Sequence, residues 1–206
     1  MDKYEETFAT WNKMASMYQE KFMELEIYNE SYDCFLNSLK YNQKHLLEIG
    51  CGPGNIARYL LKKQPDLDIL GIDIAPNMIE LAAKNNPKAS FQVMDGRAIS
   101  QLDQKFDGIV GGFCLPYFSS REAEMLISDA AGLLKDKGVI YLSFVDGDPK
   151  NSEFKTNMNG DRVYIYYHRA ETLLKLLAEN GFDLLKFYQI HYMEMNTQRV
   201  IIARKK

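Results

Sequence analysis

The chain has 206 residues, of which 46% are hydrophobic and 26% are charged, and its formal net charge is −3. A chain of this size and composition is ordinary for a globular protein with a full core, so we expect residues 1–206 to form a single domain. The slightly acidic balance argues against a large phosphate-neutralising surface and therefore disfavours a nucleic-acid partner.

The first residues carry no apolar signal-peptide core, and no segment approaches the length needed to span a membrane. Three cysteines, at positions 34, 51 and 114, cannot all pair and do not have a metal-binding spacing. We therefore expect a cytoplasmic protein with reduced thiols, no membrane association and no bound metal.

An amphipathic stripe predicts helix over most of residues 1–42. Its apolar members recur at alternating steps of three and four and are Phe8, Trp11, Ala15, Tyr18, Phe22 and Leu25. A second helix is expected from about Tyr28 to Leu39. Two interpretations of this helical cap stay open: the stripe packs on the rest of the chain as ordinary core, or part of it folds over a ligand as a lid.

The most informative stretch follows, where the strand from Leu46 ends in Glu48-Ile49 and breaks into glycines at positions 50, 52 and 54. Glycine lets a backbone turn sharply and lie close to a ligand. The amphipathic run from Asn55 to Lys63 then predicts a helix whose free N–H groups face the turn. This pattern indicates a nucleotide-type cofactor site. A dinucleotide fingerprint would need its third glycine at position 55, and no phosphate-binding Gly-Lys-Ser/Thr is present.

The next strands each end in an acidic residue. Ile69 to Asp73 is one, and a carboxylate at its end can accept hydrogen bonds from both hydroxyls of a ribose. A helix near Pro76 follows and stops before Pro87. Residues 91–94 form a further strand that ends in Asp95-Gly96, and residues 106–113 form the fourth. Alternating strands and helices predict a parallel sheet covered on both faces.

The remainder begins with Ser119 and Glu122, which form a plausible capping box for a helix reaching residue 134, followed by a strand over residues 139–145. Residues 146–168 are polar and long for a connection, which is typical of a functional or disordered loop. A helix over 169–180 ends at Gly181. Two last strands, Leu184 to Met193 and Gln198 to Arg204, are too close for a crossover and should form an antiparallel hairpin.

The stretch from Leu46 to Gly54 resembles the first motif of the class I S-adenosylmethionine-dependent methyltransferases, and the four residues from Phe106 match that family's Phe-Asp-apolar-apolar signature. The resemblance covers residues 46–145. It implies an α/β, Rossmann-like, doubly wound sheet of seven strands, mostly parallel with one antiparallel strand near the C-terminus. Residues 1–42 would be the helical cap, 43–145 the cofactor-binding core, and 146–206 the substrate-side loop, helix and hairpin.

The resemblance also implies S-adenosyl-L-methionine as cofactor and S-adenosyl-L-homocysteine as product. Glu48 would attract the ammonium of the methionine, Asp73 would bind the ribose and Asp95 would accept from the adenine. Aromatic faces, Tyr117 included, would stabilise the sulfonium. The full set of expected cofactor-binding residues is Tyr18, Glu48, Gly50, Cys51, Gly52, Gly54, Asp73, Ile74, Met78, Asp95, Gly96 and Phe113.

The acceptor is less defined. Cys114-Leu115-Pro116-Tyr117 lacks the Asp or Asn with which similar nucleobase amino-methyltransferases begin this motif, and both Cys51 and Cys114 are expected to be packing residues. The catalytic candidates are His168, as a general base for an oxygen acceptor, and Tyr117. His168 has a second interpretation, as a helix-start residue satisfied by backbone. His45 and His191 are expected to be structural.

We therefore expect methyl transfer to a small-molecule acceptor by in-line displacement, carried out by a monomer or homodimer. Three alternatives stay open. The chain would methylate RNA or a protein side chain, would bind S-adenosylmethionine without catalysis, or would be an NAD-dependent oxidoreductase, which the missing third glycine disfavours.

Overall fold

The computed structural model describes residues 2–192 and 196–206, with side chains described for 2–190 and 198–206. The expected strand from Leu184 ends at Met193, which lies outside the described residues, and so does the side chain of His191. Within the described part of the chain, no helix is both long and apolar enough to cross a membrane.

Seven strands of the described chain form one sheet in the order β3-β2-β1-β4-β5-β9-β8. Neighbours from β3 to β5 are parallel, while β9 is antiparallel to both β5 and β8, which confirms the expected fold class. The strands are β1 (His45–Ile49), β2 (Asp68–Asp73), β3 (Ser90–Val93), β4 (Phe106–Gly111), β5 (Leu134–Val145), β8 (Phe182–Tyr192) and β9 (Asn196–Lys205).

The strand order reverses between β1 and β4, which are neighbours in the sheet although two strands separate them in sequence. Chain segments leaving the carboxyl ends of these two strands diverge, and ligands of open α/β sheets bind in the crevice between them. The central strand β4 is buried along its whole length because helices cover both faces of the sheet.

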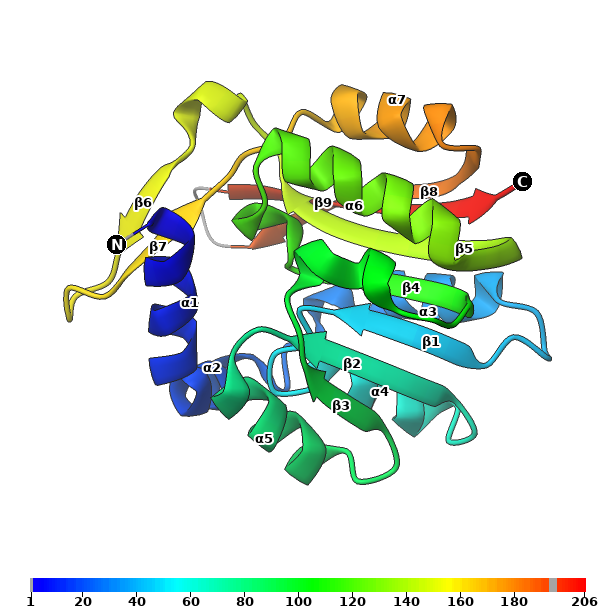
Figure 1. The fold of residues 1–206 in the computed structure, drawn as a ribbon, viewed down its shortest axis with the longest axis horizontal. Coiled ribbons are helices and arrows are strands. Elements are labelled where there is room, and N and C mark those ends of the chain that lie inside the picture. The colour runs from blue at the N-terminus through cyan, green and yellow to red at the C-terminus, as the bar shows by residue number, and fades with distance from the viewer. Residues whose placement is uncertain (1, 193–195) are drawn as a thin grey trace.

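Helices form the two outer layers (Figure 1). One apolar cluster joins α6 and α7 to the sheet, and a second joins α3 and α4 to its other face. The helices are α1 (Lys3–Lys13), α2 (Ala15–Phe22), α3 (Asn29–Ser38), α4 (Asn55–Lys63), α5 (Pro76–Asn85), α6 (Ser120–Leu133) and α7 (Ala170–Glu179), with 3₁₀ turns at Glu26–Tyr28, Gly96–Gln101, Leu115–Tyr117 and Pro149–Asn151.

Local signals set the ends of several helices as expected. The Ser119 hydroxyl accepts from the Glu122 N–H at 3.3 Å, and the Glu122 carboxylate accepts from the Ser119 N–H at 2.7 Å, which completes the capping box of α6. Gly181 follows α7 with a φ of +81°, the left-handed conformation that suits glycine. The helical cap is interrupted at Met14, where α1 ends and α2 begins.

The expectation of a loop over residues 146–168 is wrong. Strands β6 (Glu153–Thr156) and β7 (Arg162–Ile165) form an antiparallel hairpin of their own. Aromatic pairs stabilise this two-stranded ribbon, with ring centroids 5.1 Å apart for Phe154 and Tyr164 and 4.7 Å apart for Tyr164 and Tyr166. Because the ribbon has little buried surface, its sequence is polar and resembles that of a loop.

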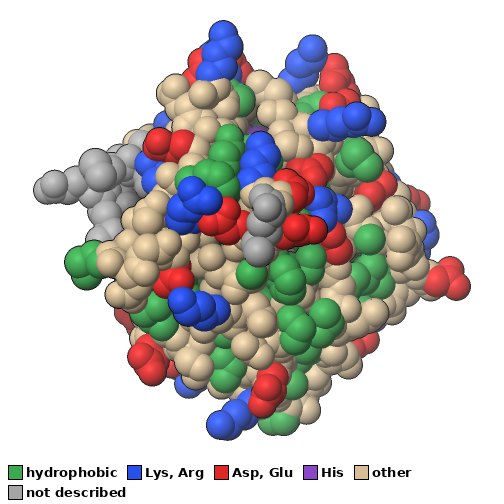
Figure 2. Space-filling view, turned by 60° about the vertical axis from the view of Figure 1, so that its left-hand side comes forward, with side chains coloured by type: hydrophobic (Ala, Val, Ile, Leu, Met, Phe, Trp, Pro, Cys, Tyr) green, Lys and Arg blue, Asp and Glu red, His purple; other side chains and the backbone are tan. Residues whose placement is uncertain are grey.

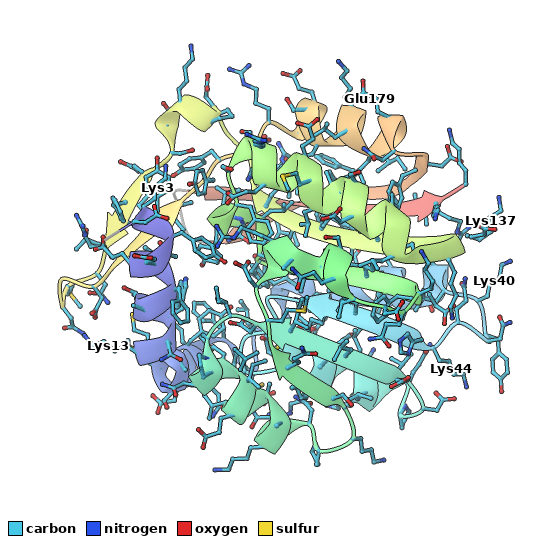
Figure 3. All side chains as sticks on the ribbon, viewed as in Figure 1. Lys3, Lys13, Lys40, Lys44, Lys137 and Glu179 are labelled. Atoms are coloured by element: carbon cyan, nitrogen blue, oxygen red, sulfur yellow. The ribbon has the colours of Figure 1, made fainter. Side chains whose placement is uncertain are left out.

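Helix α1 lies against this hairpin at the carboxyl ends of the parallel strands, with Lys3 and Lys13 at its two ends (Figure 3). The Glu6 carboxylate accepts two hydrogen bonds from Arg162, at 2.6 and 2.8 Å. Lys13 pairs with Asp161 at 2.6 Å. These contacts join the helix and the hairpin into one roof above the end of the sheet.

Candidate functional site

The glycine turn after β1 adopts backbone conformations that glycine favours. Gly50, Gly52 and Gly54 have φ values of +65°, +52° and +79°. A Cβ on Gly50 would lie 3.0 Å from the Cβ of Cys114, and a Cβ on Gly54 would lie 2.3 Å from the amide nitrogen of Asn86. Gly54 also begins α4, so the turn directs this helix N-terminus toward the crevice.

The Asp73 carboxylate at the end of β2 faces this turn. One of its oxygens accepts from the Gly52 N–H at 2.9 Å and the other accepts from the Ala75 N–H at 2.9 Å. Burial raises the pKa of Asp73, which these backbone donors partly oppose. A carboxylate has about four acceptor positions, so the group retains capacity for a further donor.

A first cavity of about 100 Å³ opens between the end of the sheet and α1. Eight of the expected cofactor-binding residues line it: Tyr18, Gly50, Gly52, Asp73, Ile74, Met78, Gly96 and Phe113. The rest of its wall consists of Tyr4, Thr7, Phe8, Trp11, Ile49, Ala75, Cys114, Tyr117 and Phe118. Its lining is mostly apolar, with the Asp73 carboxylate as its charged group.

A second cavity of about 190 Å³ adjoins the first. It lies under the hairpin and is lined by Trp11, Tyr18, Phe22, Leu25, Tyr28, Tyr32, Asn55, Phe113, Pro116, Tyr117, Val145, Lys155, Ile165 and Gln198. Four aromatic residues border both cavities: Trp11, Tyr18, Phe113 and Tyr117. They form what we call the aromatic junction. Within it, Trp11 packs edge-to-face on Tyr18 and on Tyr117, at 5.3 and 5.8 Å.

One junction residue has an unusual backbone. Phe113 follows β4 with a φ of +63°, which a bulky side chain seldom adopts. Its N–H donates to the hydroxyl of Ser143 at 2.7 Å, and Ser143 is only 1% exposed. Its ring packs edge-to-face on Tyr28 at 4.7 Å. Strained conformations of this kind persist where the surroundings hold them, and they are often found at functional sites.

The indole N–H of Trp11 is buried without a hydrogen-bond acceptor among the described residues. It lies close enough to the Tyr117 hydroxyl to lower the pKa of that phenol, but outside hydrogen-bonding geometry. Burial is the larger effect and raises the pKa of Tyr117 well above its usual range. Tyr117 therefore stays a neutral phenol at the junction.

Glu48 lies outside the lining of both cavities. One carboxylate oxygen accepts from the Ala57 N–H of α4 at 3.1 Å, while the other is buried and has no partner among the described residues. Burial raises the pKa of Glu48 to about 8. The unpaired oxygen is available to a cationic group reaching it past the glycine turn.

Asp95 also lies outside the two linings, and its carboxylate is already engaged. It accepts from the Arg97 side chain at 2.7–3.1 Å, from the Arg97 N–H at 2.9 Å and from the Tyr4 hydroxyl at 3.1 Å. Burial works to raise the pKa of Asp95, but these donors outweigh it and the pKa is lowered. Asp95 thus anchors α1, and Gly96 beside it lines the cavity instead.

His168 lies in neither cavity. The imidazole is 3% exposed, and its Nε2 lies 2.9 Å from the carbonyl oxygen of Leu115. Burial lowers the pKa of His168. His168 precedes the N-cap of α7, and its ring lies against the backbone rather than facing either cavity, so its position does not favour a role as a base.

Of the cysteines considered as site residues, Cys114 lines the first cavity and Cys51 does not. Burial raises the pKa of Cys114 to about 12 and that of Cys51 well above its usual range. Neither thiol is ionised near neutral pH. Both therefore act as small buried side chains. Among the described residues, no cluster of His, Cys, Asp and Glu is arranged to hold a metal ion.

Several cavity residues were missed from the sequence. Tyr4 continues the stripe of Phe8 and Trp11 one turn toward the N-terminus, so the helical period was a usable signal. Ser143 lines neither cavity but holds Phe113, and its place as the polar residue in the apolar run 139–145 was a weaker signal. Lys155 and Gln198 reach the site from the two hairpins, and no local pattern marks them.

A family model described as "Methyltransferase domain" matches residues 46–138. That range contains the glycine turn, Asp73 and strands β2, β3 and β4. Over this range the chain is similar to the S-adenosylmethionine-dependent methyltransferases. Its fold agrees with that of the DhpI–SAH complex, which superposes with a TM-score of 0.75 over 98% of this chain and 96% of that chain, at 17% identity.

The curated relatives of this chain carry names with different acceptors. Demethylmenaquinone methyltransferase of Thermotoga maritima is 33% identical over 130 residues, which are 63% of this chain and 53% of that protein. The tRNA N(3)-methylcytidine methyltransferase trm141 of Schizosaccharomyces pombe is 22% identical over 225 residues, covering 97% of this chain and 89% of that protein. The chain spans about half the length of the first curated relatives that it matches.

Proposed function

We propose that the protein transfers a methyl group from S-adenosylmethionine to a small-molecule acceptor. The observation that carries the proposal is the pair of adjoining cavities at the carboxyl end of the sheet, which meet at the aromatic junction. One cavity carries the features of a nucleoside site and the other is a separate aromatic chamber. A reaction between two bound molecules needs this arrangement, because it fixes their mutual orientation.

The residues present fit the cofactor. The Asp73 carboxylate retains acceptor capacity for the ribose hydroxyls, and Gly52 leaves room for the backbone to approach the ligand. Ile74 and Met78 supply an apolar wall for the adenine. The unpaired oxygen of Glu48 would receive the ammonium group, with its pKa falling as the cation arrives.

S-adenosylmethionine supplies a methyl group on a positively charged sulfur. The chain's own task is then to orient the two reactants in line and to exclude water. Trp11, Phe113 and Tyr117 border both cavities and would surround the reacting atoms. An aromatic face is attracted to a desolvated cation by about 0.5–2 kcal/mol, which favours the charged cofactor over its neutral product.

A small acceptor is supported by the roof of α1 and hairpin β6–β7, which covers both cavities. Demethylmenaquinone methyltransferase, by its name, acts on a small molecule and is a relative. RNA is the second candidate, because the chain also aligns over 97% of its length with a tRNA methyltransferase. The face carrying α1 shows charges of both signs interspersed, without a continuous basic field among the residues drawn by type (Figure 2).

Calorimetry with S-adenosylhomocysteine, alongside NAD and ATP, tests the cofactor. Selective micromolar binding of S-adenosylhomocysteine is expected, and equal or stronger binding of NAD would refute the assignment. Turnover of S-adenosylmethionine against a small-molecule panel and against total tRNA then tests the acceptor. Methylation of tRNA with a steep loss of affinity in salt would replace the small-molecule proposal by the RNA one.

A further inference from the structure

The second cavity has an unusual set of polar groups, and this inference about its ligand rests on the proposed function. Its described lining contains the amides of Asn55 and Gln198, four tyrosine phenols and one charged side chain, Lys155. Among the described lining residues there is no Asp, Glu or His. The cavity is thus aromatic, with a single cation at its hairpin side.

The described lining has no carboxylate or imidazole placed to take a proton from an acceptor near neutral pH. Burial raises the pKa values of Tyr32 and Tyr117 well above their usual range, so neither is available as a phenolate. The Gln198 carbonyl oxygen accepts from the hydroxyl of Tyr28. The pKa of Lys155 is raised by its hydrogen bond to Glu153, so Lys155 stays protonated. A general base is therefore missing from the described lining, and the acceptor has to arrive with its nucleophilic lone pair free.

Two classes of acceptor meet that condition, an unprotonated nitrogen and an anion. An aliphatic amine is an ammonium ion near neutral pH and would need to lose a proton in the cavity. It would also be repelled by Lys155 and would find no carboxylate in the described lining. An anion, by contrast, is nucleophilic without a base and is attracted to Lys155. The flat aromatic walls complement a flat ring.

We propose that the acceptor is a planar aromatic or heteroaromatic acid, ionised near neutral pH, whose negative charge lies near Lys155. The anionic molecule forms the new bond to the methyl carbon with one of its own electron pairs. The sulfur–methyl bond breaks and its electron pair stays on the sulfur, which becomes the neutral thioether of S-adenosylhomocysteine. No proton has to be passed to the protein.

Lys155 is able to serve this role because its ion pair with Glu153 is weak. Its Nζ lies 2.5 Å from the Glu153 carboxylate, but the two side chains are 48% and 59% exposed. An ion pair this exposed contributes little stability, so exchange of Glu153 for a bound anion costs little. Lys150 lies on the preceding 3₁₀ turn, is exposed and lines neither cavity, which makes it a matched control.

The test uses three probes of the same shape and different charge: 2-naphthoate, 2-naphthamide and 2-naphthylmethylammonium. Each is titrated by calorimetry into the full chain saturated with S-adenosylhomocysteine. We expect the naphthoate to bind about tenfold more tightly than the amide, and the ammonium to bind most weakly. Lys155→Met should remove the preference for the anion, Lys150→Met should keep it, and Glu153→Gln should increase it.

Tightest binding of the ammonium, or an anion preference that survives in Lys155→Met, would overturn the inference. Failure of all three probes to bind at millimolar concentration would overturn it as well. A preliminary titration with S-adenosylhomocysteine distinguishes failure of the proposed function from failure of the acceptor class. If that ligand does not bind, the proposed function fails; if it binds and the charge preference is missing, only the acceptor class fails.

Discussion

Replacement of Ser143 by alanine tests how the aromatic junction is held. Ser143 is 1% exposed, and its hydroxyl accepts from the Phe113 N–H at 2.7 Å. Phe113 has a φ of +63°, a conformation that costs a residue with a side chain about 1–2 kcal/mol. The hydrogen bond offsets that cost. Without it we expect the backbone to relax and the ring to leave the boundary of the two cavities.

The magnitude has two parts. An N–H left buried and unpaired costs about 1–3 kcal/mol, which should appear as a lower free energy of unfolding. Displacement of the Phe113 ring should also reduce the preference for the cationic cofactor over its neutral product. A lost cation–π contact of about 1 kcal/mol corresponds to a loss of about fivefold in the ratio of the two dissociation constants.

Urea unfolding gives the first quantity, and calorimetry with S-adenosylmethionine and S-adenosylhomocysteine gives the second. Tyr141→Phe is the matched control. Tyr141 lies on β5 like Ser143, and its buried hydroxyl lies 3.0 Å from that of Ser31 on α3. This control should lower stability and leave the ratio unchanged. Ser143→Thr keeps the hydroxyl and should keep the ratio. An unchanged ratio in a folded Ser143→Ala protein would refute the positioning role.

Three further outcomes are expected. Asp73→Ala should weaken binding of S-adenosylhomocysteine by about 2–4 kcal/mol in calorimetry, because two charge-assisted hydrogen bonds are lost, and wild-type affinity would show that the ribose lies elsewhere. Gly52→Val should abolish that binding in a folded protein, whereas Gly160→Val, at an exposed turn with a φ of +81°, should not. Burial raises the pKa of Glu48 from 4.5 to about 8, so between these pH values the folded protein keeps a proton that the unfolded chain releases. This group therefore lowers the free energy of unfolding as the pH rises from 4.5 to about 8. Glu48→Gln should flatten that fall in urea titrations, and a parallel slope would contradict the pKa.

The parts of the site that could be predicted from sequence are those set by the local backbone. The glycine turn and Asp73 follow from strand ends and glycine spacing, and both lie where expected. The partners of the Asp95 carboxylate could be predicted only in part. Arg97 is a near neighbour in the sequence, but Tyr4 comes from α1, which a strand-end pattern does not encode.

The residues around the second cavity were harder still to predict from the sequence. His168 suits a base by residue type, yet its ring is turned to the Leu115 carbonyl. Lys155 lies on a ribbon whose polar sequence gave no sign of strand, and it reaches the cavity only through the packing of that ribbon on α1. Tertiary contacts of this kind decide which side chains of a surface segment face a ligand.

Helix α1 contributes Trp11 to both cavities and is bonded through Glu6 to the hairpin that carries Lys155. A movement that uncovers one cavity therefore uncovers the other. Product and spent cofactor would leave in the same opening, and each turnover would begin with both ligands exchanged. An acceptor with several sites to methylate would then be released between successive methylations, so the enzyme would be distributive and partly methylated intermediates would accumulate in solution.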